Sequence, residues 1–311
     1  MDEIRKIILD CDPGHDDAIA LALAGKGKGL ELLGIGVEAG NQTLGKTGRN
    51  ALSLVEYLGL DVPVALGADR PIKRSPLTCP EIHGETGLDG FPFKEIERKF
   101  DERDAITMMK DLLLANDKVT LVPTGPLTNI GLLLQTYPEV KPHIEKIVLM
   151  GGSMGMGNVT PAAEFNILCD PEAADIVFSS GLPIYMLGLD VTRKALVTPK
   201  VIKKMKKVKN KAAKLFVTLM QVYNENQFKT FGLKGGPLHD PATIVALLNK
   251  DVFTFKKMNV SIDTSGGPSY GRTNCDISSF LGLPANAYVA TDIDRKLFFK
   301  TVKKTLERYS K

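Results

Sequence analysis

The stretch Ile7-Ile8-Leu9-Asp10-Cys11-Asp12-Pro13-Gly14-His15-Asp16-Asp17-Ala18 decides the fold and locates a site. The apolar run that begins at residue 4 has the length and β-branched character of a buried strand, and the sequence of residues 18–24 is typical of a helix. Four carboxylates lie within eight residues, 10–17, at this boundary. Because ligands of open α/β sheets bind outside the carboxyl ends of the strands, we expect a site at this turn.

The four acids repel one another unless a cation or a proton lies among them, and oxygen ligands favour Ca²⁺ or Mg²⁺. Asp16 alone could be a helix N-cap, but capping does not explain Asp10 and Asp12. An EF-hand is excluded, because a calcium loop beginning at Asp10 would need glycine where His15 stands and glutamate where Leu21 stands. The stretch therefore indicates a cation site of another kind.

The composition is that of a globular protein, with 43% hydrophobic residues and a net charge of +4. A chain of 311 residues can bury a sizeable core in one α/β domain or in two. The four cysteines are far apart and indicate neither a zinc site nor a disulfide scaffold. We find no signal peptide and no apolar run near ~18 residues, so we expect no membrane contact and a cytoplasmic location.

Residues 193–214 carry ten lysines and arginines and no acid. Such a run could contact nucleic acid, but its spacing is typical of the solvated faces of helices. Aromatic residues are missing from it, and the whole chain is close to neutral. We therefore expect no nucleic-acid partner.

Predicted strands and helices alternate along the chain. The predicted strands after the first are residues 30–37, 62–66, 118–122, 146–150, 183–187, 260–264 and 287–291. The predicted helices after the first are 44–57, 104–116, 126–134, 212–228, 242–249 and one beginning near 294. This order favours a single α/β domain over residues 1–311, with an open, mostly parallel, twisted, Rossmann-like sheet flanked by helices. The long connection 67–93 is interpreted as a mobile flap over the site.

Several later blocks complete a resemblance that begins with the opening stretch. They are Val122-Pro-Thr124-Gly-Pro-Leu-Thr-Asn129, Val148-Leu-Met150-Gly-Gly152, Ala163-Glu164-Phe165-Asn166, Asp170-Pro-Glu-Ala and His239-Asp240-Pro241. Together, these blocks resemble the nucleoside hydrolases (inosine-uridine preferring or ribonucleoside hydrolases), in that family's order and at similar spacings. The resemblance spans roughly residues 4–250 and implies Ca²⁺-dependent hydrolysis of ribonucleosides to ribose and a free purine or pyrimidine base.

The resemblance also implies the ligands of the cation. Asp12, Asp17 and Asp240 would bind Ca²⁺ through their carboxylates, and Thr124 would bind it through its backbone oxygen. Asp12 would also be the general base, and Asp10 would orient the ligands from behind. Asp240 followed by proline equally has the pattern of a helix cap, and the two roles are compatible.

A further set of side chains is expected against the substrate by the same resemblance: Asp16, Asn41, His83, Met150, Asn158, Glu164, Asn166, Tyr223 and Gln227. Tyr223 and Gln227 share a helix face at i, i+4 and would border the nucleobase, although core packing explains them equally well. Asn41 could instead be a turn residue, and His83 a surface histidine. Asp170 is interpreted as a helix cap.

Cleavage of an N-glycosidic bond needs a water nucleophile, stabilisation of an oxocarbenium-like sugar and help for the departing base. A cation can activate the water and hold the ribose hydroxyls. His239 is the expected proton donor to the base, because the usual pKa of histidine is close to working pH. The chain has no tryptophan, so indole stacking is excluded. Base preference stays open, with a lean towards inosine and uridine, and the resemblance implies a homodimer or homotetramer.

Two other functions compete with this interpretation. A Mg²⁺-dependent aspartyl-phosphate phosphohydrolase also has Asp-x-Asp after its first strand, but it would leave the Asp16-Asp17 pair and the distant His239-Asp240-Pro241 block without roles. A non-catalytic nucleoside-binding protein would share the ribose-binding side chains, but it would need no base beside a metal. Absence of turnover with retained binding would favour the second.

Overall fold

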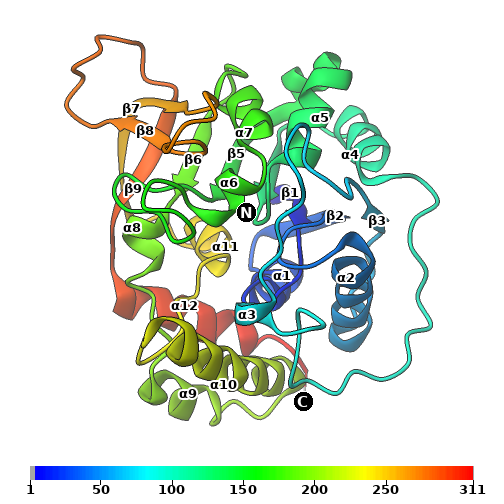
Figure 1. Ribbon diagram of the computed structural model, residues 1–311. Coiled ribbons are helices and arrows are strands. Elements are labelled where there is room, and N and C mark those ends of the chain that lie inside the picture. Colours follow the sequence, from blue (N-terminus) through cyan, green and yellow to red (C-terminus); the bar gives the residue numbers. More distant parts are fainter. Residues whose placement is uncertain (1–3, 311) are drawn as a thin grey trace.

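A computed structural model describes residues 4–310 (Figure 1). Its strands form one sheet in the order β3-β2-β1-β4-β5-β6-β9-β7-β8. Their bounds are β1 (Arg5–Cys11), β2 (Leu30–Val37), β3 (Val64–Leu66), β4 (Val119–Pro123), β5 (Ile144–Met150), β6 (Ile184–Leu187), β7 (Phe253–Ile262), β8 (Thr273–Asp276) and β9 (Ala287–Ile293). The first six follow the 3-2-1-4-5-6 order of the Rossmann fold, which confirms the predicted fold class.

All neighbouring strands from β3 across to β9 run parallel. β7 and β8 extend the far edge of the sheet in antiparallel fashion. β7 begins well before the strand predicted at 260–264, and the sequence did not predict β8. β8 is a polar segment of four residues, Thr-Asn-Cys-Asp, so it carries no apolar alternation that could reveal it.

Helices cover both faces of the sheet (Figure 1). The helices are α1 (Asp17–Lys26), α2 (Leu44–Leu58), α3 (Pro80–His83), α4 (Ala105–Leu114), α5 (Thr128–Thr136), η1 (Pro138–His143), α6 (Phe165–Cys169), α7 (Pro171–Phe178), α8 (Leu189–Thr192), α9 (Pro199–Met205), α10 (Lys211–Phe231), α11 (Pro241–Leu248) and α12 (Arg295–Leu306). Side chains alternate along β1, so Ile7 and Leu9 pack with α1, α2, α11 and α12, whereas Ile8 packs with α4, α5 and α7.

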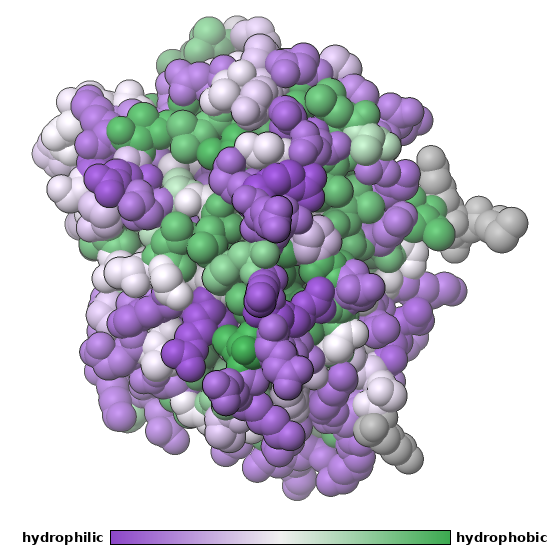
Figure 2. Space-filling model, turned by 90° about the vertical axis from the view of Figure 1, so that its right-hand side faces the viewer, coloured by the Kyte–Doolittle hydropathy of each residue, from purple (hydrophilic) through white to green (hydrophobic). Residues whose placement is uncertain are grey.

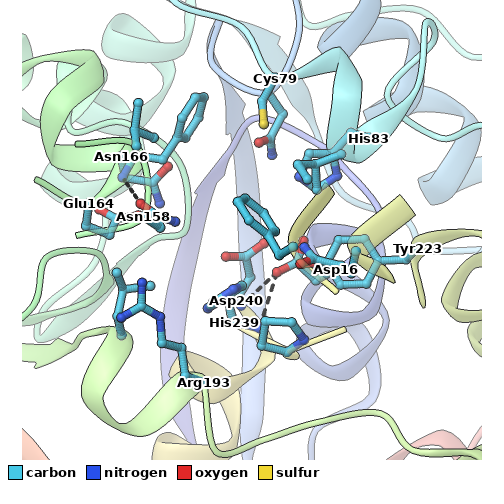
Figure 3. Close-up of a pocket in the computed structure, with 18 of the residues that line it drawn as sticks. Asp16, Cys79, His83, Asn158, Glu164, Asn166, Arg193, Tyr223, His239 and Asp240 are labelled. Carbon is cyan, nitrogen blue, oxygen red and sulfur yellow. Dashed lines mark hydrogen bonds between the residues drawn. The ribbon is translucent and has the colours of Figure 1, made fainter. Parts of the chain in front are cut away.

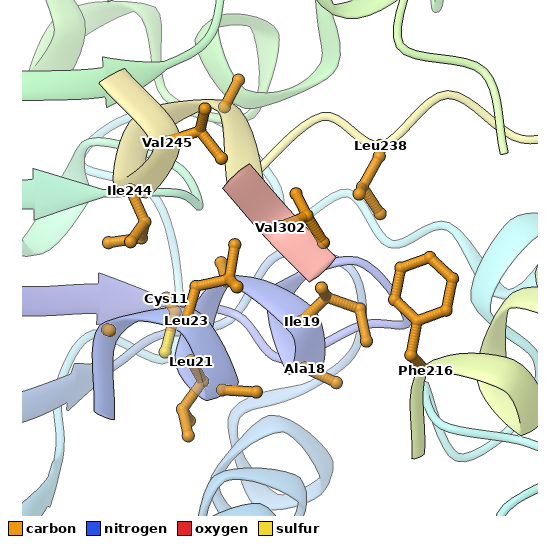
Figure 4. Close-up of a cluster of buried hydrophobic side chains, with 14 of the residues drawn as sticks. Cys11, Ala18, Ile19, Leu21, Leu23, Phe216, Leu238, Ile244, Val245 and Val302 are labelled. Atoms are coloured by element: carbon orange, nitrogen blue, oxygen red, sulfur yellow. The ribbon is translucent and has the colours of Figure 1, made fainter. Parts of the chain in front are cut away.

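The first helix lies at the centre of one core. Residues 18–24 of α1 are at most 1% exposed, and side chains of α10, α11 and α12 surround them (Figure 4). A helix that is apolar on all sides must be buried in this way. The turn before α1, which carries the acids, is therefore held firmly in the interior. Figure 2 shows hydrophilic and hydrophobic side chains interspersed on one face of the molecule.

The segment 67–93 contains α3 and is tied to the body of the protein. Gln42 Nε2 donates to the carbonyl of Gly84 at 2.9 Å, and Asn226 Nδ2 donates to that of Ile82 at 3.0 Å. The Nδ2 of Asn50 reaches the carbonyl of residue 86 at 2.8 Å. These contacts tie the predicted flap to the body of the protein in this structure, and its mobility stays a prediction. Within residues 4–310, no helix is both long and apolar enough to cross a membrane.

Candidate functional site

The site lies where the strand order reverses. β1 and β4 are neighbours, but the chain leaves β1 towards β2 on one side and leaves β4 towards β5 on the other. The carboxyl ends of the two strands therefore leave a crevice between diverging connections, the position at which open α/β sheets bind ligands. Asp12 follows β1 and Thr124 follows β4, so the switch point brings the predicted acids and the predicted backbone ligand together.

A cavity of about 610 Å³ opens above this crevice (Figure 3). Its volume is in the range of small-molecule sites. The predicted site residues that line it are Asp16, Asn41, His83, Thr124, Met150, Asn158, Glu164, Asn166, Tyr223, Gln227, His239 and Asp240. The remaining predicted residues, Asp10, Asp12 and Asp17, are buried and do not line the cavity. The structure thus gathers every predicted site residue at one place.

Three carboxylates form the cluster in the floor. Oxygens of Asp16, Asp17 and Asp240 all lie within 4.8 Å of one another. Oδ1 of Asp17 accepts a hydrogen bond from Thr124 Oγ1 at 2.8 Å, and Oδ2 accepts from Asn41 Nδ2 at 3.1 Å. This cluster differs from the predicted cation ligands in one carboxylate: the resemblance assigned Asp12 to the cation and Asp16 to the substrate.

The structure does not show the capping that was considered as an alternative role for Asp16 and Asp240. Neither Asp16 nor Asp240 makes a side-chain cap hydrogen bond to the helix that follows it. Instead, Asp16 Oδ2 accepts from the backbone N–H of His239 at 3.2 Å, which joins the first turn to the distant block (Figure 3). Asp170, by contrast, does cap α7, by accepting from Ala173 N at 3.0 Å, so its interpretation as a helix cap is confirmed.

Asp12 is fully buried beside this cluster. Its Oδ2 accepts from Asn41 N at 2.6 Å, while Oδ1 has no hydrogen-bond partner in the part of the chain described. A Cβ added to Gly40 would lie 2.1 Å from Oδ2, and one added to Gly125 would lie 2.7 Å from Oδ1. The two glycines therefore let the backbone close tightly around a carboxylate that keeps one oxygen free.

The charges of these acids indicate a cation site. Among residues 4–310, no lysine or arginine forms an ion pair with these acids. Burial, and then the neighbouring Asp17, raises the pKa of Asp12 well above its usual value and that of Asp16 to about 7. Burial, and then Asp16, raises the pKa of Asp240 well above its usual value. An all-oxygen donor set with an unpartnered carboxylate oxygen fits a hard divalent cation.

A second acid pair lies behind Asp12, and the sequence analysis missed half of it. Asp10 Oδ1 accepts from Asn129 Nδ2 at 2.9 Å, and Glu38 Oε2 accepts from the backbone N–H of Asn129 at 3.1 Å. Burial raises the pKa of Asp10 to about 7 and that of Glu38 well above its usual value. The remaining oxygens, Asp10 Oδ2 and Glu38 Oε1, have no hydrogen-bond partner within residues 4–310. Glu38 immediately follows β2, and an acid just past the end of a predicted strand was the signal in the sequence that could have identified it.

On one wall of the cavity, Asn166 links the ends of two strands. Its Nδ2 donates to the carbonyl of Thr124 at 2.8 Å and to that of Met150 at 3.1 Å. The Thr124 carbonyl, which the resemblance assigns to the cation, is therefore held in place from the substrate side. The oxygen of the Asn166 amide stays available to the cavity.

Glu164 and Asn158 lie on the same wall (Figure 3). Glu164 Oε2 accepts from Gly152 N at 2.9 Å and from Ile167 N at 3.1 Å, so this side chain caps α6. Burial raises the pKa of Glu164. Asn158 Oδ1 accepts from Phe165 N at 2.9 Å, which leaves its amide N–H groups free. The wall thus presents paired acceptors and donors, as a diol-binding surface requires.

The opposite wall carries the two histidines. His83 is 5% exposed, so it is not a surface residue, and its ring stacks on Tyr223 at 5.7 Å between centroids. Burial lowers the pKa of His83 well below its usual value and that of His239 to about 3. The usual pKa of histidine, on which the choice of His239 as proton donor rested, therefore does not hold in this buried position, which the sequence could not show. Its role as the donor stays a prediction. A neutral imidazole carries one N–H. His239 offers it to the cavity from Nε2 when Nδ1, 2.7 Å from Thr192 Oγ1, accepts the proton of that hydroxyl.

Arg193, at the end of α8, is a residue of the site that the sequence analysis assigned to the solvated basic run. Among the described residues that line the cavity, it is the one lysine or arginine. Its Nη1 donates to the carbonyl of Met156 at 3.1 Å, and its Nη2 donates to that of Gly157 at 2.6 Å. Arg193 therefore holds the loop after β5 at the rim. Its place in the segment that follows the predicted strand 183–187 was the one signal in the sequence.

The fold and the site together define an α/β enzyme whose buried acids meet polar sugar-binding groups at the switch point. Residues 7–300 match the family model for inosine-uridine preferring nucleoside hydrolase. The pyrimidine-specific ribonucleoside hydrolase RihB of Escherichia coli O1:K1 is 47% identical over 310 residues, 99% of each chain.

Solved structures agree with this match. A purine-preferring ribonucleoside hydrolase from Gardnerella vaginalis has a TM-score of 0.91 at 34% identity and covers 97% of this chain and 98% of its own. A plant nucleoside hydrolase has a TM-score of 0.88 at 29% identity and covers 97% and 99%. The chain belongs to the nucleoside hydrolase family and is a ribonucleoside hydrolase, an enzyme acting on N-glycosyl bonds. This membership replaces the phosphohydrolase and binding-protein alternatives.

Proposed function

We propose that this enzyme hydrolyses pyrimidine ribonucleosides to ribose and the free base, and that it depends on Ca²⁺. The observation that carries the proposal is the buried carboxylate cluster beneath a cavity of about 610 Å³. The preference for pyrimidines is supported by the 47% identity to relatives named pyrimidine-specific, against 34% to a solved structure named purine-preferring.

Ca²⁺ would be held by the carboxylates of Asp12, Asp17 and Asp240 and by the backbone oxygen of Thr124. When bound, it would lower the pKa of an adjacent water molecule and orient the vicinal hydroxyls of the ribose. Ca²⁺ suits this site because it accepts variable coordination geometry, and the donors here come from three separate segments of the chain. Asp10, with Glu38 and Asn129, would keep the turn in position from behind.

Asp12 is the proposed general base. Its Oδ2 is held by the backbone N–H of Asn41 at 2.6 Å, and its Oδ1, which has no partner among the described residues, would take the proton of the attacking water molecule. Asp16, Asn158 and Glu164 would bind the ribose hydroxyls, together with Asn41, Met150 and Asn166. Binding the sugar through several directed hydrogen bonds fixes the anomeric carbon relative to Asp12.

The departing base lies on the histidine wall in this proposal. The backbone N–H of His15 donates to His83 Nδ1 at 3.1 Å, so the neutral ring of His83 carries its proton on Nε2. His83 and His239 would each donate an N–H to the negative charge that develops on the base. Tyr223 and Gln227 would border the ring of the base.

We further propose a cytoplasmic, single-domain enzyme that assembles as a homodimer or homotetramer, with no nucleic-acid or membrane partner. The four free thiols suit a reducing compartment. Light scattering of the purified protein tests the assembly. A mass equal to that of one chain would overturn it.

The proposal is tested by measuring reducing-sugar release from uridine, cytidine, inosine, adenosine and 2′-deoxyuridine. We expect kcat/KM for uridine and cytidine to exceed that for the purines at least ~10-fold, which corresponds to about 1.4 kcal/mol. We expect 2′-deoxyuridine to be a poor substrate because it lacks a hydroxyl that the site binds. Faster hydrolysis of purines would overturn the base preference, and equal rates with Mg²⁺ in place of Ca²⁺ would overturn the metal.

A further inference from the structure

His15 is a buried histidine that the proposed mechanism does not use as an acid or base. It lies inside the acidic turn and is 0% exposed. Its ring stacks on His83, with centroids 5.6 Å apart and planes at 28°, and on Tyr223, at 5.8 Å and 25°. Since His83 and Tyr223 also stack on each other, the three rings form one closed cluster. The cluster joins the acidic turn, α3 and α10.

The polar atoms of His15 extend this connection to a loop. Nε2 lies 3.0 Å from the carbonyl of Asp89, and a carbonyl can only accept, so Nε2 carries a proton. Asp89 in turn organises residues 84–90: its carboxylate accepts from the backbone N–H groups of Glu85 and Thr86, each at 3.0 Å. The side chain of His15 therefore fastens a self-contained loop next to His83.

The backbone of His15 acts on His83 directly. Its N–H donates to His83 Nδ1, which fixes the position of the imidazole and leaves Nε2–H as the group that the ring can offer to a ligand. The same residue thus sets the donor through its backbone and supports the surrounding loop through its side chain. A change in the side chain would let the loop relax and shift the ring that the backbone bond orients.

We propose that His15 is a positioning residue for departure of the base: it connects the acidic turn to His83, Tyr223 and loop 84–90, and so holds the N–H of His83 where the leaving group develops charge. This inference rests on the proposed function of His83 as a donor to the base. It predicts an effect on bond cleavage that depends on the leaving group, because only a poor leaving group needs that donor.

The test compares uridine with p-nitrophenyl β-D-riboside, whose leaving group departs without protonation. We expect His15→Leu to lower kcat for uridine ~10- to 100-fold, with a smaller change in KM, and to leave kcat for the nitrophenyl riboside within about threefold of the wild type. His15→Gln keeps a donor at the position of Nε2 and should recover part of the loss. His15→Phe keeps an aromatic ring but not the donor, and separates stacking from the hydrogen bond.

Two further measurements make the result interpretable. Calorimetric titration of Ca²⁺ into the metal-stripped variants should give affinities within about twofold of the wild type. Amide hydrogen exchange in loop 84–90 should accelerate in His15→Leu and His15→Phe but not in His15→Gln. His143→Gln is the matched control, because this histidine lies outside the cavity lining and its Nδ1 contacts the carbonyl of Asn116 at 3.1 Å.

An equal loss with both ribosides in His15→Leu, or no loss with uridine, would overturn the inference. A wild-type enzyme that releases p-nitrophenol but not uracil would overturn the proposed function. In that case, unchanged hydrogen exchange in His15→Leu would independently overturn the positional role of the side chain. The two failures are therefore distinguishable.

Discussion

Replacing Gly14 by alanine places a methyl group where the site has no room for it. The added Cβ would lie 2.4 Å from His83 Nδ1, 2.7 Å from His83 Cε1 and 2.9 Å from Asn41 Nδ2. Carbon needs roughly 1 Å more than the shortest of these distances. Either the ring of His83 or the acidic turn must therefore move by about that amount. Both carry groups assigned to the reaction.

The magnitude follows from this displacement. Overpacking of a closed interior costs about 1–3 kcal/mol of the free energy of unfolding. A misplacement of about 1 Å at a reacting group costs on the order of 100-fold in rate. We therefore expect Gly14→Ala to lower kcat/KM for uridine ~100-fold, or about 2.7 kcal/mol in transition-state stabilisation, while the protein stays folded.

Steady-state kinetics and a thermal melt on the same preparation test this expectation. Gly45→Ala is the control, because a Cβ at this helical glycine of α2 meets no atom within 4 Å. The control should melt at the same or a higher temperature and keep its activity. Activity of Gly14→Ala within threefold of the wild type would refute the close approach of the turn to His83.

Three further changes test other parts of the structure. Glu38→Gln should become more stable relative to the wild type as the pH rises. The raised folded-state pKa of Glu38 means that its stabilisation is full below its unfolded pKa and is lost as pH rises through the folded pKa, whereas glutamine does not titrate. Urea unfolding over a pH series measures this, and a difference in the free energy of unfolding that does not change with pH would contradict it. Arg193→Met should raise KM for uridine up to ~10-fold with kcat within twofold, whereas Lys194→Met should change neither, because Arg193 alone of the two holds the rim loop. Tyr309→Phe should cost about 1–2 kcal/mol of stability by thermal melt without loss of activity, because the buried Tyr309 hydroxyl donates to the carbonyl of Ala22 at 2.8 Å.

The parts of the site that could be predicted are those that a local pattern in the sequence marks. An apolar run that ends in Asp10 and Asp12 marks a strand end, and the alternation of strands and helices identifies the sheet that places such ends together. The same logic placed Thr124 after another strand. Its role through a backbone oxygen came only from the resemblance, because a carbonyl has no sequence signature.

The rest depends on contacts between distant segments. His15 touches His83, 68 positions away, and Asp89, 74 positions away, so no local pattern could reveal its environment. In the sequence, Glu38 and Arg193 resemble ordinary polar residues. The fold buries Glu38 and places Arg193 at the rim of the cavity. The lowered pKa of His239 has the same origin, since burial is a property of the assembled structure.

The most direct test of the central claim is a calcium titration of the metal-stripped enzyme with uridine as substrate, in buffer free of phosphate. Uracil and ribose are both quantified. We expect no turnover before Ca²⁺ is added, recovery that saturates at one Ca²⁺ per chain, and uracil and free ribose in equal amounts. Full turnover by the stripped enzyme, or uracil formed without free ribose, would contradict the assignment of Asp12, Asp17, Asp240 and Thr124 to a calcium site that serves hydrolysis.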